Sequence, residues 1–343
     1  MKTSRVGVDL AKNVFQLHGV DRHGETVLKR RLSREKWISV LIKSAEPDCE
    51  VGMEACGGAH YWARLLMAKG FRVKIIPPQF VTPYVKSNKN DANDAEAICE
   101  AMSRPTMRFV KAKSVEQQDI QATHRIRSEL MCHRTAKGNQ IRGLATEYGL
   151  VAPLQMASLR SAIPRWLEDA ENGLTDRFRA LLHGLWDDLL TLDKRIETLN
   201  KDIESIAKSD PVAQRLQQLR GVGPLVATAL IARVGNGDEF RTGRQMSASV
   251  GLTPRQHSSG GKARLLGISK RGDAYLRGIL IHGARAVVSQ AKNKEDRLSR
   301  WVTGLADRRH PNVAAVALAN KTVRMAWAMM KHDADYNPEF ATS

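Results

Sequence analysis

The chain has 343 residues, a formal net charge of +18 and 42% hydrophobic residues. This length allows two domains with their own cores, and the composition is typical of a folded rather than a disordered protein. So large a positive charge repels itself unless a polyanion neutralises it, which makes nucleic acid the leading partner. A ribosomal or membrane-surface protein would share the charge but would need no group of carboxylates.

Residues 1 to about 110 alternate between strand and helix patterns. Strands are predicted at 4–10, 14–20, 25–32, 49–54 and 71–76. Helices are predicted at 33–42, with Ser33 as the cap, at 60–69, closed by Gly70, and at 91–102. Three antiparallel strands followed by alternating strands and helices form an α/β layer fold. RNase H-like domains, including Holliday-junction resolvases, have this order.

The rest of the chain is predicted to be mostly helical. A polar helix is expected at 115–147 and a long one at 176–208, with a looser stretch that contains Pro153 and Pro164 between them. In the long helix apolar residues recur at alternating steps of four and three, which is a heptad pattern. A helix packed on its own domain would explain this stripe. Its narrowness favours a coiled coil, either between subunits or with the preceding helix. The heptad residues are Phe178, Leu182, Leu185, Leu189, Leu192, Ile196, Leu199, Ile203 and Ile206.

These patterns divide the chain into four parts. We expect an RNase H-like α/β domain at 1–112 and a helical and coiled-coil linker at 113–210. A mainly helical, Gly-punctuated and basic domain is expected at 211–332, and a flexible tail at 333–343. The predicted fold class is therefore α/β plus all-α.

The four cysteines, Cys49, Cys56, Cys99 and Cys132, form no C-x-x-C pair. Neither a zinc site nor a disulfide framework is therefore expected. The N-terminus lacks the pattern of a signal peptide, and no apolar stretch approaches the ~20 residues that cross a bilayer. We expect a cytoplasmic, nucleoid-associated protein with no membrane partner.

Four carboxylates fall where such a fold would bring them together. Asp9 ends the strand pattern V-G-V-D and Glu54 ends V-G-M-E, so both would project from the carboxyl edge of a sheet. Asp91 and Asp94 lie three apart, on one face of the first turn of a helix. Oxygen ligands of this kind suit Mg²⁺. Two such ions can activate an attacking oxygen and stabilise the leaving one.

Each carboxylate also has a purely structural interpretation. Asp91 could cap the helix, Asp94 could interact with the helix dipole, and Asp9 could form a turn. Taken singly, these interpretations are favoured. Taken together, in an order that suits one fold, the four residues favour a metal site. Nearby side chains that could hold a phosphate backbone at its rim are those of Lys86, Lys89 and Asn90.

In the C-terminal part, R-G-V-G-P joins two helical patterns and resembles a helix–hairpin–helix. Its glycines, Gly221 and Gly223, would let backbone N–H groups approach phosphates closely, with Arg220 and Arg233 beside them. An ordinary turn between two helices explains the same letters equally well. Nucleic-acid binding by this turn is therefore one of two open interpretations.

The segment 251–277 concentrates basic residues around a Gly-rich loop with serines. A serine hydroxyl there could attack a phosphodiester if cations bind the non-bridging oxygens and a base accepts its proton. From the residues alone, a phosphate-contacting turn is favoured over a nucleophile. His257 is more typical of a solvent-facing histidine than of a base. The residues expected to contact nucleic acid are Arg255, Lys262, Arg264, Lys270 and Arg271.

Several motifs occur together in one order: D-L-A-K-N, M-E-A-C-G, K-N-D-A-N-D-A, R-G-V-G-P, G-L-T-P-R-Q-H-S-S-G and I-S-K-R-G-D-A-Y-L-R. Over nearly its whole length the chain resembles the DEDD transposases of insertion sequences, whose members act as bridge-RNA-guided recombinases. The resemblance implies a RuvC-like N-terminal domain, a coiled-coil region and a C-terminal transposase domain. The metal-binding tetrad that it implies, for two Mg²⁺ ions or alternatively Mn²⁺, is Asp9, Glu54, Asp91 and Asp94.

The resemblance also implies a nucleophilic serine in the C-terminal domain. In the family this serine directly precedes a glycine after G-L-x-P, which here is Ser259, with Ser258 as its competitor. It would form a covalent phosphoserine link to DNA while metal ions assist. The tetrad of one subunit would meet the serine of another, in a homo-oligomer (dimer or tetramer) formed through the coiled coil.

The partners that the resemblance implies are donor DNA, target DNA and a noncoding bridge RNA. Two other functions stay open. One is a metal-dependent junction endonuclease that hydrolyses DNA with water and needs no serine. The other is a non-enzymatic organiser of nucleic acid that binds through its charge.

Overall fold

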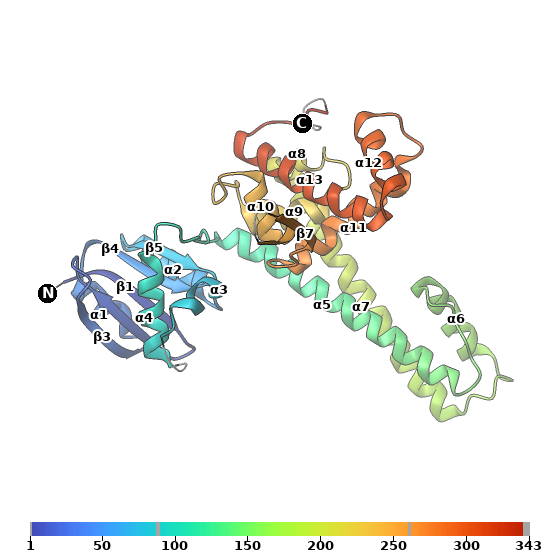
Figure 1. Cartoon of the computed structure of the whole chain (residues 1–343). Helices are drawn as coiled ribbons and strands as arrows, with labels where there is room; N and C mark the ends of the chain where they lie inside the picture. Colours follow the sequence, from blue (N-terminus) through green and yellow to red (C-terminus); the bar gives the residue numbers. More distant parts are fainter. Residues whose placement is uncertain (1, 87–89, 260–261, 339–343) are drawn as a thin grey trace. The chain divides into compact units, whose positions relative to one another are not determined.

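The computed structural model describes residues 2–86, 90–259 and 262–338, without the side chains of Ser259 and Ala263. The chain forms two compact units, Met1–Val115 and Glu116–Ser343 (Figure 1). None of the helices in these ranges combines the length and hydropathy needed to cross a membrane.

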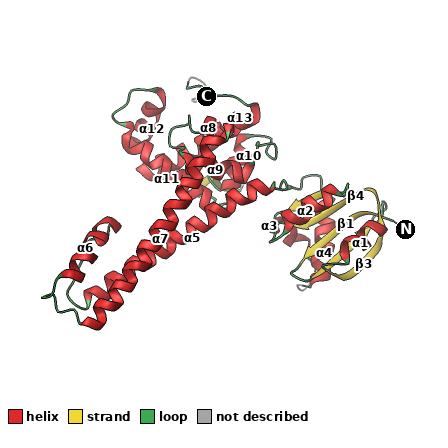
Figure 2. Cartoon of the chain, turned by 180° about the vertical axis from the view of Figure 1, so that it is seen from behind, coloured by secondary structure: helices red, strands yellow, loops and turns green. Residues whose placement is uncertain are grey.

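The first unit is built on a five-stranded sheet with the strand order β3-β2-β1-β4-β5 (Figure 2). Its strands are β1 (Thr3–Leu10), β2 (Val14–Val20), β3 (Thr26–Ser33), β4 (Ala45–Glu54) and β5 (Arg72–Ile76). The first three form an antiparallel meander, whereas β4 is parallel to β1 and β5 is parallel to β4. The predicted mixed α/β class is therefore confirmed. The five strands lie where they were predicted to within one residue at each end, except that β4 begins at Ala45, four residues before the predicted start at Cys49.

Helices cover both faces of this sheet. α1 (Trp37–Ser44) and α2 (Ala59–Ala68) pack on the face that carries Phe15, whose ring lies 5.2 Å from that of Trp37 and 5.3 Å from that of Trp62. α4 (Asp91–Met102) lies on the other face and follows α3 (Pro78–Val81) and η1 (Thr82–Tyr84).

The predicted start of α1 is wrong. Ser33 does not cap the helix, because its backbone still pairs with Val14 as the last residue of β3. The helix begins four residues later, after Lys36, and Lys36 makes no side-chain capping hydrogen bond. The two ends of α4, by contrast, are those predicted from the sequence.

Two strand glycines let α4 lie directly on the sheet. A Cβ atom added at Gly7 would collide with the carbonyl oxygen of Ala95, and one added at Gly52 would collide with the sulfur of Met102. A side chain at Gly7 would meet the helix backbone and push the helix away, whereas one at Gly52 would displace the flexible side chain of Met102. Gly7 and Gly52 each stand two residues before a candidate carboxylate. In each of the motifs V-G-V-D and V-G-M-E, the glycine thus packs against α4 and the acidic residue lies at the end of the strand.

The second unit begins with two long antiparallel helices, α5 (Val115–Thr146) and α7 (Asp176–Ser209), which lie side by side in both views (Figures 1 and 2). Lys137 forms an ion pair with Asp188 at 2.9 Å, and Arg134 forms one with Asp193 at 3.4 Å. Residue numbers therefore increase along α5 in the direction in which they decrease along α7, so the two helices are antiparallel. The heptad stripe of α7 therefore packs in a hairpin with the preceding helix, one of the two predicted arrangements. Its buried members are Phe178, Leu182, Leu189, Ile196 and Ile203.

A helix that the sequence analysis did not predict lies between these two. α6 (Met156–Glu168) contains Pro164 in its interior, which is why the stretch was expected to be loose. Leu159 and Ile163 of α6 are fully buried in a core shared with Ile141 of α5 and Leu182 of α7. Tertiary burial of this apolar stripe therefore outweighs the proline.

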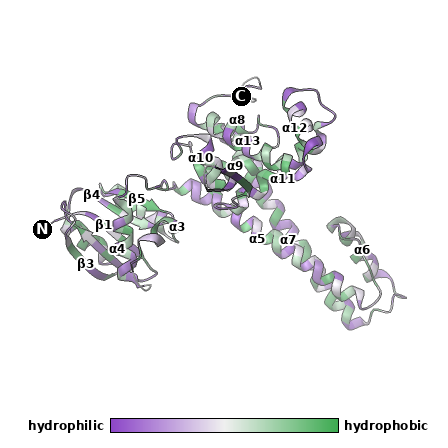
Figure 3. Ribbon diagram, in the orientation of Figure 1, coloured by the Kyte–Doolittle hydropathy of each residue, from purple (hydrophilic) through white to green (hydrophobic). Residues whose placement is uncertain are grey.

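The remaining elements surround the largest core of the protein. They are α8 (Pro211–Leu216), α9 (Pro224–Val234), α10 (Gly243–Val250), β6 (Pro254–Ser259), β7 (Lys262–Ile268), α11 (Ala274–Ala291), α12 (Arg297–Arg308) and α13 (Pro311–His332). Figure 3 shows hydrophobic residues concentrated in α9, whereas hydrophilic residues run along α5 and α7. The backbone of Tyr336 donates to Gln218 at 2.8 Å, which anchors the segment after α13.

The serine-containing segment is not the flexible loop that the sequence predicts. β6 and β7 pair antiparallel and form a hairpin, with Ser258 opposite Ala263 and Ser259 opposite Lys262. The Gly- and Ser-rich letters hid the strands because these residues are more typical of turns. The turn itself, residues 260–261, lies outside the described ranges.

Candidate active site

Neighbouring parallel strands carry Asp9 and Glu54 to the same edge of the sheet. Val8 pairs with Met53 in the ladder between β1 and β4, so the next residue of each strand is a carboxylate. Both side chains are half-buried. Both also act on the exposed residue Cys56. Partial burial, followed by the negative charges of Glu54 and Asp9, raises the pKa of its thiol. The two carboxylates therefore lie within electrostatic reach of one sulfur.

The first turn of α4 supplies the other two carboxylates. Asn90 caps the helix, since its side-chain oxygen accepts a hydrogen bond from the backbone of Ala92 at 3.0 Å. The interpretation of Asp91 as the cap is therefore wrong. Asp91 and Asp94 occupy the first helical turn, with Asp91 exposed and Asp94 half-buried.

Three of the four predicted carboxylates come together. Each of Asp9, Asp91 and Asp94 offers an oxygen, and these oxygens all lie within 4.8 Å of one another. Ligands at about 2.1 Å from a Mg²⁺ ion lie within about 4.2 Å of each other, so small side-chain rotations would let all three share one cation. Glu54 lies outside this closest group but stands beside Asp9 on the neighbouring strand. The all-oxygen donor set fits a hard divalent cation.

The three residues expected at the rim of this cluster have different roles. Lys86 is exposed and forms an ion pair with Glu96 at 3.1 Å, which lowers the pKa of the Glu96 carboxyl. Asn90 serves as the helix cap. Lys89 lies outside the described residues.

A polar row beside the cluster escaped the sequence analysis. Asp9 pairs with Gln16 of β2, and Gln16 pairs with Arg31 of β3. Directly opposite residues share a face, so these three side chains lie on the face that carries α4. Arg31 is exposed on the edge strand, whereas its neighbour Arg30 pairs with Leu17 on the opposite face. The letters L-K-R-R-L carry the alternation but do not show which strands are neighbours.

Ser259 is the last residue of β6, at the tip of the hairpin. Ser258, its predicted competitor, is exposed, and its hydroxyl accepts a hydrogen bond from the side chain of Gln256 at 2.8 Å. His257 is exposed as expected and stands opposite Arg264. Both serines therefore remain candidates for the nucleophile.

The base of the hairpin is fixed to the helices around it. Gly251 and Gly272 have φ angles of 79° and 85°, a conformation that favours glycine. A Cβ atom at Gly251 would collide with the carbonyl oxygen of Arg271. Arg277 donates to the carbonyl of Val250 at 2.9 Å. The motif residues before and after the hairpin, such as Gly251 and Arg277, thus anchor its base to the neighbouring helices.

The hairpin presents positive charge to the solvent. The five basic residues that were expected to contact nucleic acid are all exposed. Within the described part of the chain, none of them forms an ion pair. Leu265, 66% exposed, lies among them. A basic surface with an exposed apolar side chain suits contact with a polyanion. The five residues are Arg255, Lys262, Arg264, Lys270 and Arg271.

The R-G-V-G-P turn has partners inside its own unit. Arg220 donates to Asp296 at 2.7 Å and to Ser299 at 2.9 Å. Burial opposes ionisation of Asp296, but hydrogen bonds from Ser299 and Arg220 outweigh it and lower the pKa of Asp296 to about 2. A Cβ atom at Gly221 would lie 2.9 Å from the Gly283 oxygen, whereas Gly223 faces open space. These contacts favour the ordinary helix–helix turn.

Comparison with known proteins connects both regions to one family. Residues 213–299 match a family model described as "Transposase IS116/IS110/IS902 family", and residues 6–149 match a second model described as "Transposase". The first match contains the serine hairpin and the second contains all four carboxylates.

Relatives at high identity span the whole chain. A protein of Pseudomonas aeruginosa named probable family 20 transposase is 50% identical over 98% of this chain and 100% of its own length. The transposase for insertion sequence element IS1111A of Coxiella burnetii is 47% identical over 96% of this chain and 90% of its own length. The transposase for insertion sequence element IS1328 of Yersinia enterocolitica is 41% identical over 94% and 96%, respectively.

Proposed function

The chain belongs to the IS116/IS110/IS902 family of insertion-sequence transposases, which act on DNA, and from this premise we propose how it cuts and rejoins strands. Ser259 attacks a DNA phosphate while the carboxylates of Asp9, Glu54, Asp91 and Asp94 complete the active site. The observation that carries this proposal is the approach of oxygens from two separate motifs, on β1 and α4, to within 4.8 Å of one another.

The proposed cofactor is Mg²⁺, as a pair of ions, with Mn²⁺ as a substitute. The supporting observation is the donor set, which among the described residues consists of carboxylate oxygens from Asp9, Asp91 and Asp94. Glu54, beside Asp9, supplies a fourth carboxylate for the second ion. When bound, such ions would stabilise the negative charge on the reacting phosphate and promote ionisation of an attacking hydroxyl.

The serine step conserves the energy of the phosphodiester bond. The Ser259 oxygen forms a bond to phosphorus, the deoxyribose oxygen leaves with the electron pair of the broken bond, and the serine proton passes to solvent or to the leaving group. Attack by a hydroxyl of another strand then reverses the step and frees the serine. The exposed cations Arg255, Lys262 and Arg264 would bind the non-bridging oxygens.

The fold of the first unit supports an RNase H-like assignment. Its sheet has three antiparallel strands and two parallel ones, with carboxylates at the ends of β1 and β4 and at the start of α4. In this proposal Arg31 and Gln16, in the row that includes Asp9, guide the DNA strand toward the carboxylates. Phosphate contacts of this kind position a strand without reading its sequence.

The carboxylates and Ser259 belong to different compact units. We propose that a complete site combines the carboxylates of one subunit with the serine of another, in a dimer or tetramer that the α5–α7 hairpin helps to form. A noncoding bridge RNA that pairs with donor and target DNA is the proposed guide. The net charge of +18 supports a second polyanion beside DNA.

One experiment separates this mechanism from hydrolysis by water. The protein is incubated with Mg²⁺, DNA of the element's ends and the adjoining noncoding RNA, then denatured and examined for a protein–DNA adduct. We expect an adduct with the native chain and with Ser258→Ala, its matched control, and none with Ser259→Ala. If Ser259→Ala still cuts DNA and no adduct forms with any variant, the chain is a metal-dependent endonuclease.

A further inference from the structure

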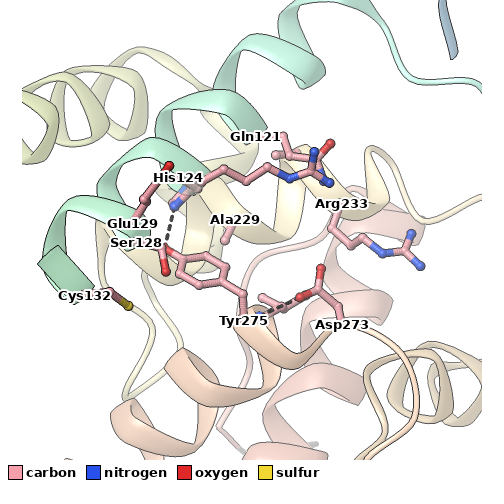
Figure 4. A pocket seen from close by; sticks show the side chains of 12 residues that line it. Gln121, His124, Ser128, Glu129, Cys132, Ala229, Arg233, Asp273 and Tyr275 are labelled. Carbon is pink, nitrogen blue, oxygen red and sulfur yellow. Dashed lines mark hydrogen bonds between the residues drawn. The ribbon is translucent and has the colours of Figure 1, made fainter. Parts of the chain in front are cut away.

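A cleft of about 480 Å³ opens in the second unit between α5, α9 and the start of α11 (Figure 4). One face of α5 forms a polar wall. The opposite side is apolar and consists of Ala229 and Ala232 of α9 together with Leu276 of α11. The ring of Tyr275 lines the cleft between these two sides. The residues of the polar wall are Gln121, Arg125, Ser128, Glu129 and Cys132.

A directional chain of hydrogen bonds fixes Tyr275. The hydroxyl of Thr228 donates to the carbonyl of Pro224 at 2.7 Å, so Thr228 must accept from Nε2 of His124, 2.9 Å away. Nδ1 of His124 then carries no proton and accepts from the Tyr275 hydroxyl at 2.9 Å. Burial, with a smaller contribution from Arg127, lowers the pKa of His124 to about 4, which keeps the ring neutral as this chain requires.

The fixed tyrosine has a defined hydrogen-bonding character. Its proton is committed to His124 and its oxygen already interacts with the Arg127 side chain, so toward a ligand that oxygen offers only a remaining lone pair as acceptor. The carboxylate of Glu129 is a further acceptor, and Gln121 can both donate and accept. Arg125 is exposed and, among the residues described, has no ion-pair partner, whereas Arg233 pairs with Glu239 at 3.3 Å. The cleft therefore combines acceptors, which include the carboxylate of Asp273, with an apolar side and the exposed cation Arg125.

This combination matches one nucleotide. A nucleobase is planar, presents N–H donors on its edge and has apolar faces. The phosphate of the nucleotide supplies a negative charge that can pair with the positive guanidinium of Arg125. The volume falls in the range of pockets that enclose a small ligand and is too small for a duplex. Single unpaired nucleotides are recognised in this manner, by stacking and by hydrogen bonds to the base edge.

We propose that the cleft holds one nucleotide extruded from the bound nucleic acid, with its base against Tyr275 and its phosphate at Arg125. This inference rests on the proposed function insofar as nucleic acid must be the partner. The residues that line the cleft include none of those proposed for catalysis. The cleft would therefore fix the position of a strand on the second unit rather than cut it.

The test places 2-aminopurine, whose fluorescence depends on how its base is stacked, at successive positions of the element-end DNA and, separately, of the noncoding RNA. We expect one position whose emission changes on binding to the native chain, and the arm that shows it identifies the source as DNA or RNA. Ser128→Trp fills the cleft from α5. It should abolish this signal and weaken binding of that oligonucleotide by about tenfold, the loss of one stacked base.

Thr135→Trp is the matched control, because Thr135 lies on the exposed part of α5 and does not line the cleft. It should leave the signal and the affinity unchanged. The absence of any position with changed emission in either arm, or a change that survives Ser128→Trp, overturns the cleft proposal. The Ser259–DNA adduct is measured on the same samples. An adduct without a cleft signal rejects only the cleft, whereas a cleft signal without any adduct rejects only the serine mechanism.

Discussion

The acidic cluster and the serine hairpin are built on opposite principles. Asp9 and Asp94 are half-buried, and the helix that carries Asp94 is seated on Gly7 without any intervening side chain. Among the described residues, the hairpin is anchored at its base, by Gly251 and its contacts, while its strands are largely exposed. In the proposed mechanism, carboxylates that share a cation must hold their mutual distances, whereas the nucleophile must reach a large polyanion. The acidic cluster is therefore held in place by close packing, whereas the serine hairpin is accessible to the solvent.

The largest expected effect comes from removing one charge in the rigid region. Asp9→Asn should lower the rate of strand cleavage by about a hundredfold to a thousandfold, because a preorganised charge in the active site is lost. DNA binding, measured by gel shift, should be retained. Glu96→Gln is the control, since Glu96 lies on the same helix as Asp94 but pairs with Lys86. Equal rates for the two variants would exclude the cluster from the active site.

The helices that support the hairpin should respond to acid. The unfolded chain protonates His124 as the pH falls below about 6.5, whereas in the folded protein His124 stays neutral down to a pKa of about 4. The unfolded state then binds more protons, so the folded state loses stability as the pH falls through this window, by up to about 3 kcal/mol from this residue.

Urea denaturation at several pH values checks this expectation. His124→Gln should be less stable than the native chain at pH 7, because the hydrogen-bond chain to Thr228 is weakened. The difference in stability between the two proteins should shrink as the pH falls from 6.5 to 4. A constant difference across this window would contradict the neutral, buried state of His124.

Addition of one Cβ atom at Gly7 should disrupt the close packing of α4 on the sheet. Gly7→Ala introduces a Cβ where the carbonyl oxygen of Ala95 stands, and we expect a loss of about 2 kcal/mol in stability together with weaker cleavage. Gly57→Ala, in the same unit, meets no atom within 4 Å and should be nearly neutral. Thermal unfolding measures both. A Gly7→Ala protein as stable as Gly57→Ala would show that the helix does not depend on this contact.

The smallest effect concerns the polar row beside the cluster. Arg31→Ala should weaken DNA binding by a few-fold and reduce the salt dependence of binding by about one phosphate contact. Arg30→Ala removes the same charge from the opposite face and should leave the salt slope unchanged. Binding titrations at several salt concentrations compare the two. Identical slopes would mean that DNA does not follow the row from Asp9 to Arg31.

Much of the first unit could be predicted because local patterns and tertiary packing agree there. The acidic start of α4, its alanine-rich turns and its end at Met102 were all legible in the sequence. The proximity of Asp9 to Glu54 followed from two strands that each end in a carboxylate. The pairing of Val8 with Met53 in the parallel ladder confirms that Asp9 and Glu54 are neighbours. Arg31 was missed because strand alternation does not reveal which strand is the neighbour.

The second unit shows where such inference fails. Proline is usually excluded from helix interiors. Burial of Leu159 and Ile163 nevertheless keeps α6 helical around Pro164. The letters around Ser259 are those of turns, and only the pairing of β6 with β7 makes them strands. His124 gave no signal among the other polar residues of α5, because its partners Thr228 and Tyr275 are more than a hundred residues away.

The four cysteines are free thiols and differ in exposure, which has one practical consequence. Cys49 and Cys99 are buried, and burial raises the pKa of each thiol to about 11, so neither should react at neutral pH. Cys56 and Cys132 are exposed, one beside the carboxylates and the other in the wall of the cleft. The chain thus carries one native attachment point for a spin label in each compact unit. In the proposed oligomer, distances between such labels would report how the carboxylates of one subunit lie relative to the cleft of another.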